Sequence, residues 1–238
     1  MADSHASSLV QALPAPQGSL LWLIDLQHEP EPAHWAACDA DEQARAGRFR
    51  FEVHARRYRA AHAAMRQIMG AQLGVHAASL RWRIGARDKP HLQDHAGWHF
   101  NLSHSGDWAL LGMSPSLPIG VDIECHKEMR DMAGIVGHQF SAVEQAAYAR
   151  LHSGDQTDWF FSMWSRKEAC LKALGSGLSV SSQTFDVDAS QACVDTAVPV
   201  NGQLCAMTVH DVPLPAHIEA KAAVALVHAG SHHLANAF

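Results

Sequence analysis

The chain has 238 residues, of which 47% are hydrophobic and 18% are charged. This balance is typical of a globular protein, and the length suffices for one large domain or two small ones. The net charge of −6 with neutral histidines argues against a broad nucleic-acid-binding surface, because such domains are usually basic.

The cysteines and the hydropathy pattern bear on the cellular compartment. An odd number of cysteines without CxxC spacing indicates free thiols in a reducing environment rather than a disulfide framework. These residues are Cys38, Cys125, Cys170, Cys193 and Cys205. No apolar run reaches membrane-spanning length, and the N-terminus lacks the features of a secretory signal. We therefore expect a soluble, cytoplasmic protein.

The first part of the chain contains patterns for two strands around a helical region. Residues 1–18 show no pattern of an ordered element. Residues 20–26 form a short apolar run that is typical of a buried strand. Residues 39–70 carry apolar side chains near helical spacing and end on a glycine, and residues 79–84 alternate as a strand does.

The rest of the chain predicts a second cycle of strands and helices. Strands are expected at residues 98–102, 108–113, 119–124, 181–188, 203–210 and 221–228. A turn over residues 103–107 joins the first two. Helices are expected at residues 141–151, with Ser141 as N-cap, and at residues 158–174, closed by the glycines that follow.

This order of elements favours an α+β fold with two halves that meet near residue 115. We assign residues 19–115 to the first half and residues 116–229 to the second. Residues 1–18 would form a poorly ordered N-terminus, and residues 230–238 a C-terminal tail. The chain shows no convincing internal sequence repeat.

Asp122 and Glu124 belong to the run G-V-D-I-E at residues 120–124. Because side chains alternate along a strand, these two carboxylates project from the same face. Such a pair supplies the oxygen ligands that Mg²⁺ prefers. Taken alone, the same pattern is more often the hydrated face of an amphipathic strand.

The predicted helix over residues 158–174 carries Glu168 and Lys172 one turn apart, at the same edge of its buried stripe. A surface ion pair at this spacing contributes only about 0.3–0.5 kcal/mol and needs no functional explanation. The glycine-rich ending of the helix, followed by a strand, instead favours a helix held rigidly against a sheet. This segment alone leaves both interpretations open.

Ser103, His104 and Ser105 end the run F-N-L-S-H-S at residues 100–105. Their hydroxyl, imidazole and backbone N–H groups suit an anion, although a polar hairpin turn has the same composition. Neighbouring serine and histidine side chains point apart on an extended chain, and the sequence has no GxSxG motif. A Ser-His-Asp hydrolase is therefore disfavoured.

The first helical region is rich in arginine although the chain is acidic overall. These residues are Arg45, Arg48, Arg50, Arg56, Arg57, Arg59 and Arg66. Lys89 follows in the segment before the second half. Most of the arginines would form a solvated face. One or two directed at a cleft would bind a terminal phosphate, because a guanidinium pairs with phosphate oxygens in a bidentate manner.

Residues 40–228 resemble the 4′-phosphopantetheinyl transferases of the longer, Sfp-type class, in which these motifs occur in the same order and at similar spacing. The resemblance implies two similar α+β halves related by a pseudo-two-fold axis, with coenzyme A bound in the cleft between them. Asp122 and Glu124 match the metal-binding pair. Glu168, in W-S-R-K-E-A, matches a third metal-associated carboxylate that is also the proposed general base, and Lys172 matches the lysine near the pyrophosphate.

The resemblance also implies which residues contact coenzyme A. They are Ser103 and His104 at the phosphates, Lys89 of the family's G-K-P element, and Arg45 and Arg57 near the 3′-phosphate. Two positions depart from the family pattern. Asp88 replaces the glycine of G-K-P, so this loop is expected to bend differently, and Glu42 stands where relatives can carry a basic residue.

The implied reaction is transfer of 4′-phosphopantetheine from coenzyme A to a serine of an apo acyl or peptidyl carrier protein, with release of 3′,5′-ADP. The cofactor would be Mg²⁺, with Mn²⁺ as an alternative. We expect a monomer without nucleic-acid or membrane partners. Fatty-acid, polyketide and peptide-synthetase carriers are not distinguished. Two alternatives stay open: a Mg²⁺-dependent hydrolase of nucleotides or of the coenzyme A pyrophosphate, and a non-enzymatic coenzyme A-binding module.

Overall fold

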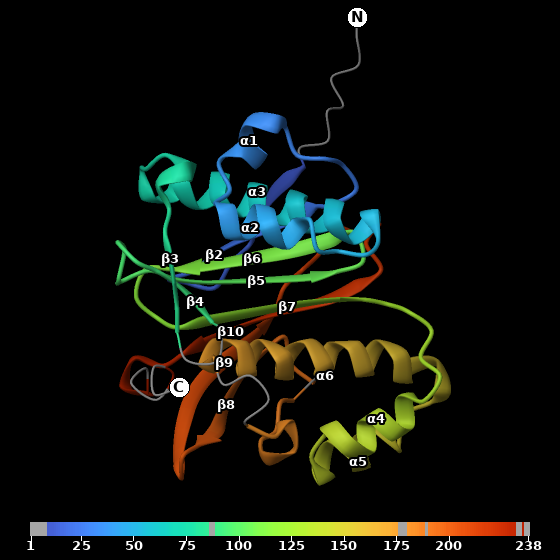
Figure 1. Cartoon of the computed structure of the whole chain (residues 1–238). Coiled ribbons are helices and arrows are strands. Elements are labelled where there is room, and N and C mark those ends of the chain that lie inside the picture. Colours follow the sequence, from blue (N-terminus) through green and yellow to red (C-terminus); the bar gives the residue numbers. More distant parts are fainter. Residues whose placement is uncertain (1–8, 86–88, 176–179, 189, 232–234, 236–238) are drawn as a thin grey trace, which may run out of the picture.

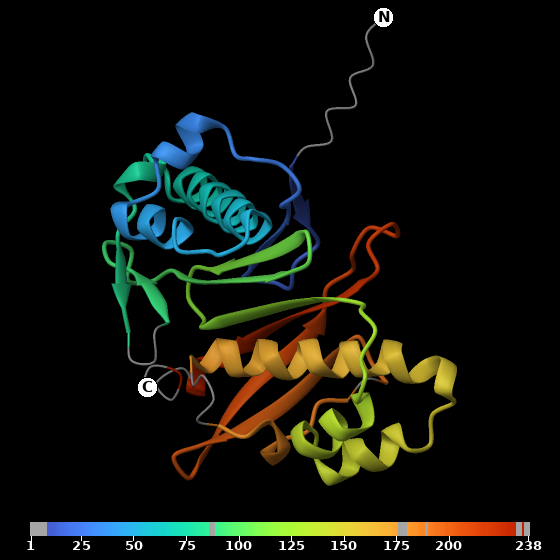
Figure 2. The same ribbon diagram turned by 45° about the vertical axis from the view of Figure 1, so that its right-hand side comes forward.

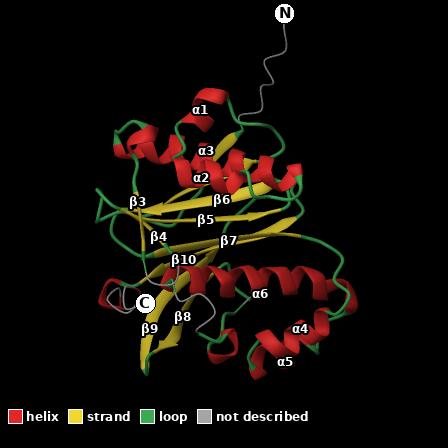
Figure 3. Ribbon diagram, viewed as in Figure 1, coloured by secondary structure: helices red, strands yellow, loops and turns green. Residues whose placement is uncertain are grey.

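The computed structural model describes residues 9–85, 89–175, 180–188, 190–231 and 235. Within this part of the chain, two α+β halves lie one above the other, each with its own antiparallel sheet (Figure 1). Helices of the first half lie above its sheet, and one long helix runs along the second sheet (Figure 3). The predicted α+β class with two halves is confirmed.

The first half is built on one sheet and a small hairpin. The sheet has the order β1 (Val10–Leu13), β2 (Leu20–Asp25), β6 (Trp108–Ser114) and β5 (His99–Ser105). The other elements are α1 (Pro32–Ala36), α2 (Ala40–Ala46), α3 (Glu52–Leu73), the short 3-10 helix Ala77–Ser79, and the hairpin of β3 (Trp82–Ile84) and β4 (Pro90–Leu92). Strand β1 lies within residues 1–18, where the sequence indicated no element, and it pairs with β2.

The helical region predicted over residues 39–70 is two helices, with a break at residues 47–51 that begins at a glycine, a weak helix former. Gly70 does not end α3. A Cβ at this position would lie 2.8 Å from the carbonyl oxygen of Val75, so glycine is needed for a close approach of the backbone. The helix ends instead at Gly74, which has a φ of 68°.

The second half repeats the plan of a sheet covered by a helix. Its sheet has the order β7 (Ile119–Cys125), β10 (Ala220–Val227), β9 (Gln203–Asp211) and β8 (Cys193–Val200). Its helices are α4 (Met132–Gln139), α5 (Ala142–Tyr148), α6 (Ser153–Leu174), and the 3-10 helices Ser182–Thr184 and Ala229–Ser231. Ser141 caps α5 as predicted, in a reciprocal capping box with Glu144.

The strand predicted over residues 181–188 is wrong. This segment contains a 3-10 turn and extended chain whose backbone groups bond to side chains instead of a neighbouring strand. Lys167 Nζ donates to the carbonyl oxygens of Ser182 and Phe185, and Val187 N–H donates to Glu144 Oε1. The apolar alternation therefore reflects burial of a loop. Strand β8, at the sheet edge, was missed.

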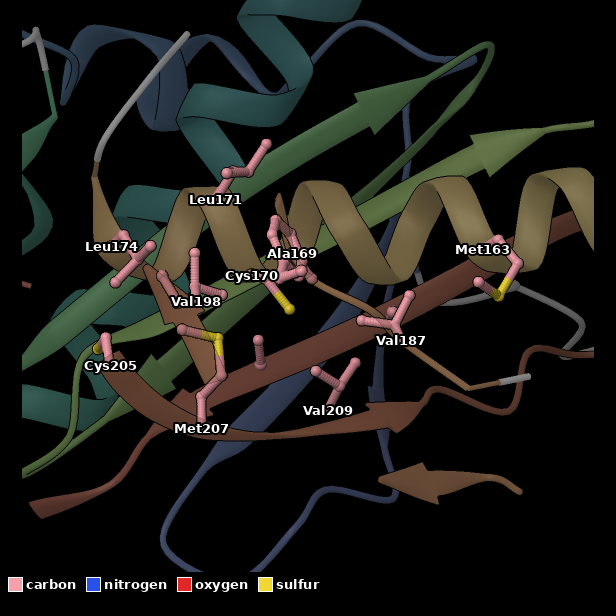
Figure 4. Close-up of a cluster of buried hydrophobic side chains, with 14 of the residues drawn as sticks. Met163, Ala169, Cys170, Leu171, Leu174, Val187, Val198, Cys205, Met207 and Val209 are labelled. Carbon is pink, nitrogen blue, oxygen red and sulfur yellow. The ribbon is translucent and has the colours of Figure 1, made fainter. Parts of the chain in front are cut away.

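The elements stack in four layers, with α3 outside the first sheet, the two sheets facing each other, and α6 outside the second sheet (Figure 2). One apolar cluster joins the sheets and includes Leu21, Leu110, Val121 and Val224. Another lies between α6 and the second sheet (Figure 4). Because residues from both halves share the first cluster, the halves form one continuous body.

Two further expectations concern thiols and membranes. All five cysteines lie in described residues, and each is a free thiol, as expected. Among the described helices, none combines the length and the apolar character required to cross a lipid bilayer.

Gly120 explains how α6 comes to lie directly on β7. A Cβ at this position would overlap backbone atoms of Ala169 and Ala173 and lie 2.8 Å from the carbonyl carbon of Lys172. A larger residue would push the helix away from the strand. Gly120 thus determines how close Glu168 on α6 lies to the carboxylates of β7.

We expect Gly120→Ala to lower the free energy of unfolding by about 1–3 kcal/mol, because the added methyl group overpacks the helix–strand contact. Urea denaturation measures this loss. Gly137→Ala in α4 is the matched control, since a Cβ there meets no heavy atom within 4 Å among the described residues. Equal losses of stability for the two variants would contradict the close approach of α6.

Candidate active site

Ser103, His104 and Ser105 lie in strand β5, not in the turn that the sequence predicted over residues 103–107. The strand continues because its pairing with β6 extends to the pair Ser105–Trp108. Since side chains alternate along a strand, the two serines project to one face and His104 to the other. The serines reach β7, the edge strand of the second half.

The two edge strands β5 and β7 are joined by side chains. In the described chain they belong to separate sheets, so a continuous backbone ladder does not connect them. Asn101 Oδ1 accepts a hydrogen bond from Val121 N–H at 2.9 Å, and Ser105 Oγ accepts one from Cys125 N–H at 3.1 Å. We call this junction of β5 and β7 the seam.

Ser103, Asp122 and Lys172 meet at the seam from three elements. Lys172 Nζ on α6 lies 2.5 Å from Asp122 Oδ1 on β7 and donates to Ser103 Oγ on β5 at 2.8 Å. Ser103 Oγ in turn donates to Asp122 Oδ1 at 2.9 Å. The structure therefore brings together residues from three of the motifs that the sequence singled out.

Asp122 is buried, with only 2% of its surface exposed. Burial raises the pKa of this carboxyl to about 6, although the Lys172 charge and the hydrogen bonds from Lys172 and Ser103 oppose the shift. Its second oxygen, Oδ2, is buried and has no hydrogen-bond partner among the described residues. A buried carboxylate oxygen without a partner is costly, which indicates that a donor or a cation binds there.

Glu124 and Glu168 lie beside this group. Glu124 Oε2 accepts a hydrogen bond from Ser105 Oγ at 3.0 Å, so Ser105 orients a carboxylate, a role that the sequence reading missed. Alternation in F-N-L-S-H-S, which puts both serines on one face, is the signal for it. Burial raises the pKa of Glu168, and the Glu124 charge raises it further, while Lys172 acts in the opposite direction.

The residues at the seam fit a hard divalent cation. The donors are carboxylate oxygens of Asp122, Glu124 and Glu168, with one uncompensated oxygen at Asp122. Burial is the main cause of the raised pKa values at Asp122 and Glu168 and outweighs the opposing charge of Lys172, so both carboxylates lie in a poorly hydrated place. In the described residues, however, no three acidic, histidine or cysteine side chains are already gathered closely enough to hold an ion. Lys172 occupies the other Asp122 oxygen.

His104 lies on the opposite face of β5, where it is exposed to solvent. Its pKa is lowered, first because neighbouring atoms remove part of its hydration and second because Lys172, His62 and Arg57 are nearby positive groups. Arg57 on α3 is held by Asp107, whose Oδ1 accepts from Arg57 Nε at 2.8 Å. This side of β5 therefore presents basic side chains of the kind that bind an anion.

A cavity of about 530 Å³ adjoins this positive region and is lined by Arg45, Tyr58, His62, Trp82, Pro90 and Leu102, among others. The Arg45 guanidinium lies over the ring of Tyr58, 5.6 Å from its centroid. Aromatic rings with basic groups suit a nucleotide, since the rings stack on a base and the cations bind phosphate.

Asp39, Asp41 and Glu42 also line this cavity, so its wall is mixed in charge, and Glu42 is paired with basic groups. It accepts a hydrogen bond from Arg66 Nε at 2.6 Å and lies 2.8 Å from His62 Nδ1. Burial alone would raise the pKa of Glu42, but the hydrogen bonds from His62 and from the Asp39 backbone and the Arg66 charge lower it. The charge of Glu42, which was expected to weaken phosphate binding, is thus compensated by Arg66 and His62.

Lys89 is not among the residues that line this cavity, and its ammonium contacts the backbone at the end of α6. Its Nζ donates to the carbonyl oxygens of Lys172 at 2.7 Å and Ala173 at 2.9 Å, at the end of α6. Burial lowers the pKa of Lys89 to about 8. Asp88 lies outside the described residues, as does Gly177, the second of the glycines expected to follow the helix over residues 158–174.

Comparisons with known proteins agree with this geometry. Residues 118–225 match the family model of the 4′-phosphopantetheinyl transferase superfamily, and residues 27–116 match that of the 4′-phosphopantetheinyl transferase N-terminal region. The chain is 36% identical to 4′-phosphopantetheinyl transferase HetI of Nostoc sp. over 164 residues, which cover 67% of this chain and 69% of the relative.

Two further relatives come from Bacillus subtilis. The 4′-phosphopantetheinyl transferase ffp is 34% identical over 148 residues, and the 4′-phosphopantetheinyl transferase Sfp of strain 168 is 31% identical over 149 residues. Each match covers 62% of this chain and 65% of the relative. The chain belongs to the 4′-phosphopantetheinyl transferase superfamily, a family of enzymes.

Proposed function

We propose that this chain transfers the 4′-phosphopantetheine group from coenzyme A to a serine hydroxyl of an apo acyl or peptidyl carrier protein, releasing 3′,5′-ADP. The observation that carries the proposal is the meeting of Ser103, Asp122 and Lys172 at the seam, with Glu124 and Glu168 beside them. Few reactions need carboxylates, one ammonium and an anion-binding face at a single place.

The phosphates of coenzyme A are assigned to the end of β5. The pyrophosphate lies across the strand end, with Ser103 Oγ, turned from Asp122, as donor on the seam side and His104 as donor on the other side, and Arg45 and Arg57 bind the 3′-phosphate. The nucleotide portion occupies the 530 Å³ cavity, with Trp82 and Tyr58 as stacking surfaces. The basic groups near His104 support this placement, because Arg57, bonded to Asp107 Oδ1, is held in position before any ligand binds.

Asp122, Glu124 and Glu168 are the residues that would hold Mg²⁺, or Mn²⁺ in its place. When bound, the ion neutralises charge on the pyrophosphate oxygens. Burial of Asp122 and the contact of Ser105 with Glu124 keep two of these carboxylates in place before any ligand binds. Lys172, one turn beyond Glu168, supplies a positive charge for the leaving phosphate.

Glu168 is the general base of the proposed reaction. A carboxylate whose pKa is raised is a stronger base, so it accepts the proton of the attacking serine hydroxyl more readily than a fully hydrated glutamate does. The oxygen then attacks the β-phosphorus, the bond to the 3′,5′-ADP oxygen breaks, and phosphopantetheine is left on the carrier. The close contact of α6 with Gly120 keeps Glu168 near the carboxylates of β7.

Intact mass analysis of several apo carrier proteins incubated with the chain, coenzyme A and Mg²⁺ tests this proposal. We expect a mass gain of one phosphopantetheine group on at least one carrier. Steady release of 3′,5′-ADP in the absence of any carrier would instead favour the hydrolase alternative. Binding of coenzyme A without either product would favour a non-enzymatic binding module.

We expect Glu168→Gln to lower kcat roughly 10²- to 10⁴-fold, the usual contribution of a general base, while coenzyme A still binds. Steady-state rates of carrier modification and calorimetric binding of coenzyme A measure the two effects. Glu31→Gln, at an exposed residue before α1, is the matched control. A Glu168→Gln variant that folds and works at the normal rate would remove the base from the mechanism.

We expect Asp122→Asn to raise the Mg²⁺ concentration needed for half-maximal rate roughly tenfold or more, because even the neighbours of metal ligands contribute that much to affinity. A Mg²⁺ titration of the transfer rate measures this change, and removal of the metal with a chelator should abolish transfer. Asp94→Asn, in the exposed segment after β4, serves as control. An unchanged titration would contradict the metal assignment.

A further inference from the structure

Lys89 connects the first half of the protein to the end of α6. It precedes β4 in the chain, yet its ammonium lies on two carbonyl groups more than 80 residues away, those of Lys172 and Ala173. The last carbonyls of a helix have no partner within the helix, and a positive charge there is favourable. Gly175 N–H supplies another bond to Lys172 O, at 3.2 Å.

This contact involves the residue whose side chain is in the site. Lys172 presents its carbonyl to Lys89 and its ammonium to Asp122 and Ser103. The backbone of Lys172 is therefore held by Lys89, while its side chain binds Asp122 and Ser103. A shift of the last helical turn would move the Lys172 ammonium away from Asp122.

The stem of Lys89 passes close to the end of α6. A Cβ placed on Gly175 would lie 2.8 Å from Lys89 Cδ, and both residues line a cavity of about 580 Å³. No acidic group is among the causes of its lowered pKa, which is due to burial. A buried amine is tolerated where its protons are hydrogen-bonded, and here two of them reach carbonyl oxygens.

The hairpin β3–β4 connects the contact between Lys89 and α6 to the nucleotide cavity. Trp82, Ile84 and Pro90 line the cavity, and Lys89 immediately precedes Pro90. A group that fills the cavity would therefore lie against the strand that follows Lys89.

We propose that Lys89 is a positioning residue that holds the last turn of α6, and with it Lys172, against the hairpin wall of the nucleotide cavity. This inference rests on the proposed function. Lys89 then affects the rate through the placement of Lys172 and has little effect on the affinity for coenzyme A. Small misplacements of a reacting group cost up to about 10²-fold in rate.

The test compares Lys89→Met and Lys89→Arg with wild type, and with Lys127→Met as control at an exposed lysine. We expect Lys89→Met to lower kcat of carrier modification about 10- to 100-fold and to change KM for coenzyme A by less than about twofold. Lys89→Arg should not restore the rate in full, because a planar guanidinium does not reproduce the contact of a compact ammonium with two carbonyl oxygens. An increased KM with normal kcat, restored by arginine, would instead assign Lys89 to a phosphate.

Hydrogen exchange separates failure of this inference from failure of the proposed function. The amides of residues 171–175 should exchange faster in Lys89→Met than in wild type, whether or not any carrier is modified. Unchanged exchange in a folded variant would overturn the positioning role. If wild type is inactive but the expected exchange difference is seen, the contact of Lys89 with α6 is supported and the transferase reaction is rejected.

The stability of the protein should also depend on pH through Lys89. Burial lowers its pKa from 10.5 to about 8, so between these values the unfolded chain binds a proton that the native state does not. Stability contributed by this group therefore rises with pH across that window. Urea denaturation at several pH values should show this gain in wild type and not in Lys89→Met; parallel curves would contradict burial of the amine.

Discussion

The site depends on the way in which two edge strands are joined. Strands β5 and β7 end separate sheets, and the polar side chains of Asn101, Ser103 and Ser105 span the distance between them. Because these contacts use alternate residues of one strand, a shift of one residue would turn all three away. The register of β5 against β6 thus determines which side chains of β5 reach the site.

The seam concentrates charge that the rest of the fold must balance. Asp122 is buried and partly compensated by Lys172, while Glu124 and Glu168 add negative charge beside it. On the other face of β5, the cations around His104 favour an anion. A divalent cation would balance the carboxylates at the seam, and an anionic donor would balance the basic groups near His104. A phosphate-linked substrate that binds with a metal ion therefore suits this place.

Local geometry was sufficient to predict much of this arrangement. Alternation in G-V-D-I-E and the one-turn spacing of Glu168 and Lys172 depend only on backbone periodicity. The contacts of Lys89 and Arg66 depend on segments distant in the chain, so no pattern could indicate them. Residues 181–188 misled because burial of Phe185 and Val187 in a loop produces the same alternation as a strand.

A crystal structure of the protein with coenzyme A and Mg²⁺ tests the central claim most directly. The account predicts that the pyrophosphate lies beside Ser103 and Lys172 and that the ion is bound by carboxylates from both β7 and α6. Coenzyme A bound away from the seam, or an ion without contact to Asp122, would contradict it.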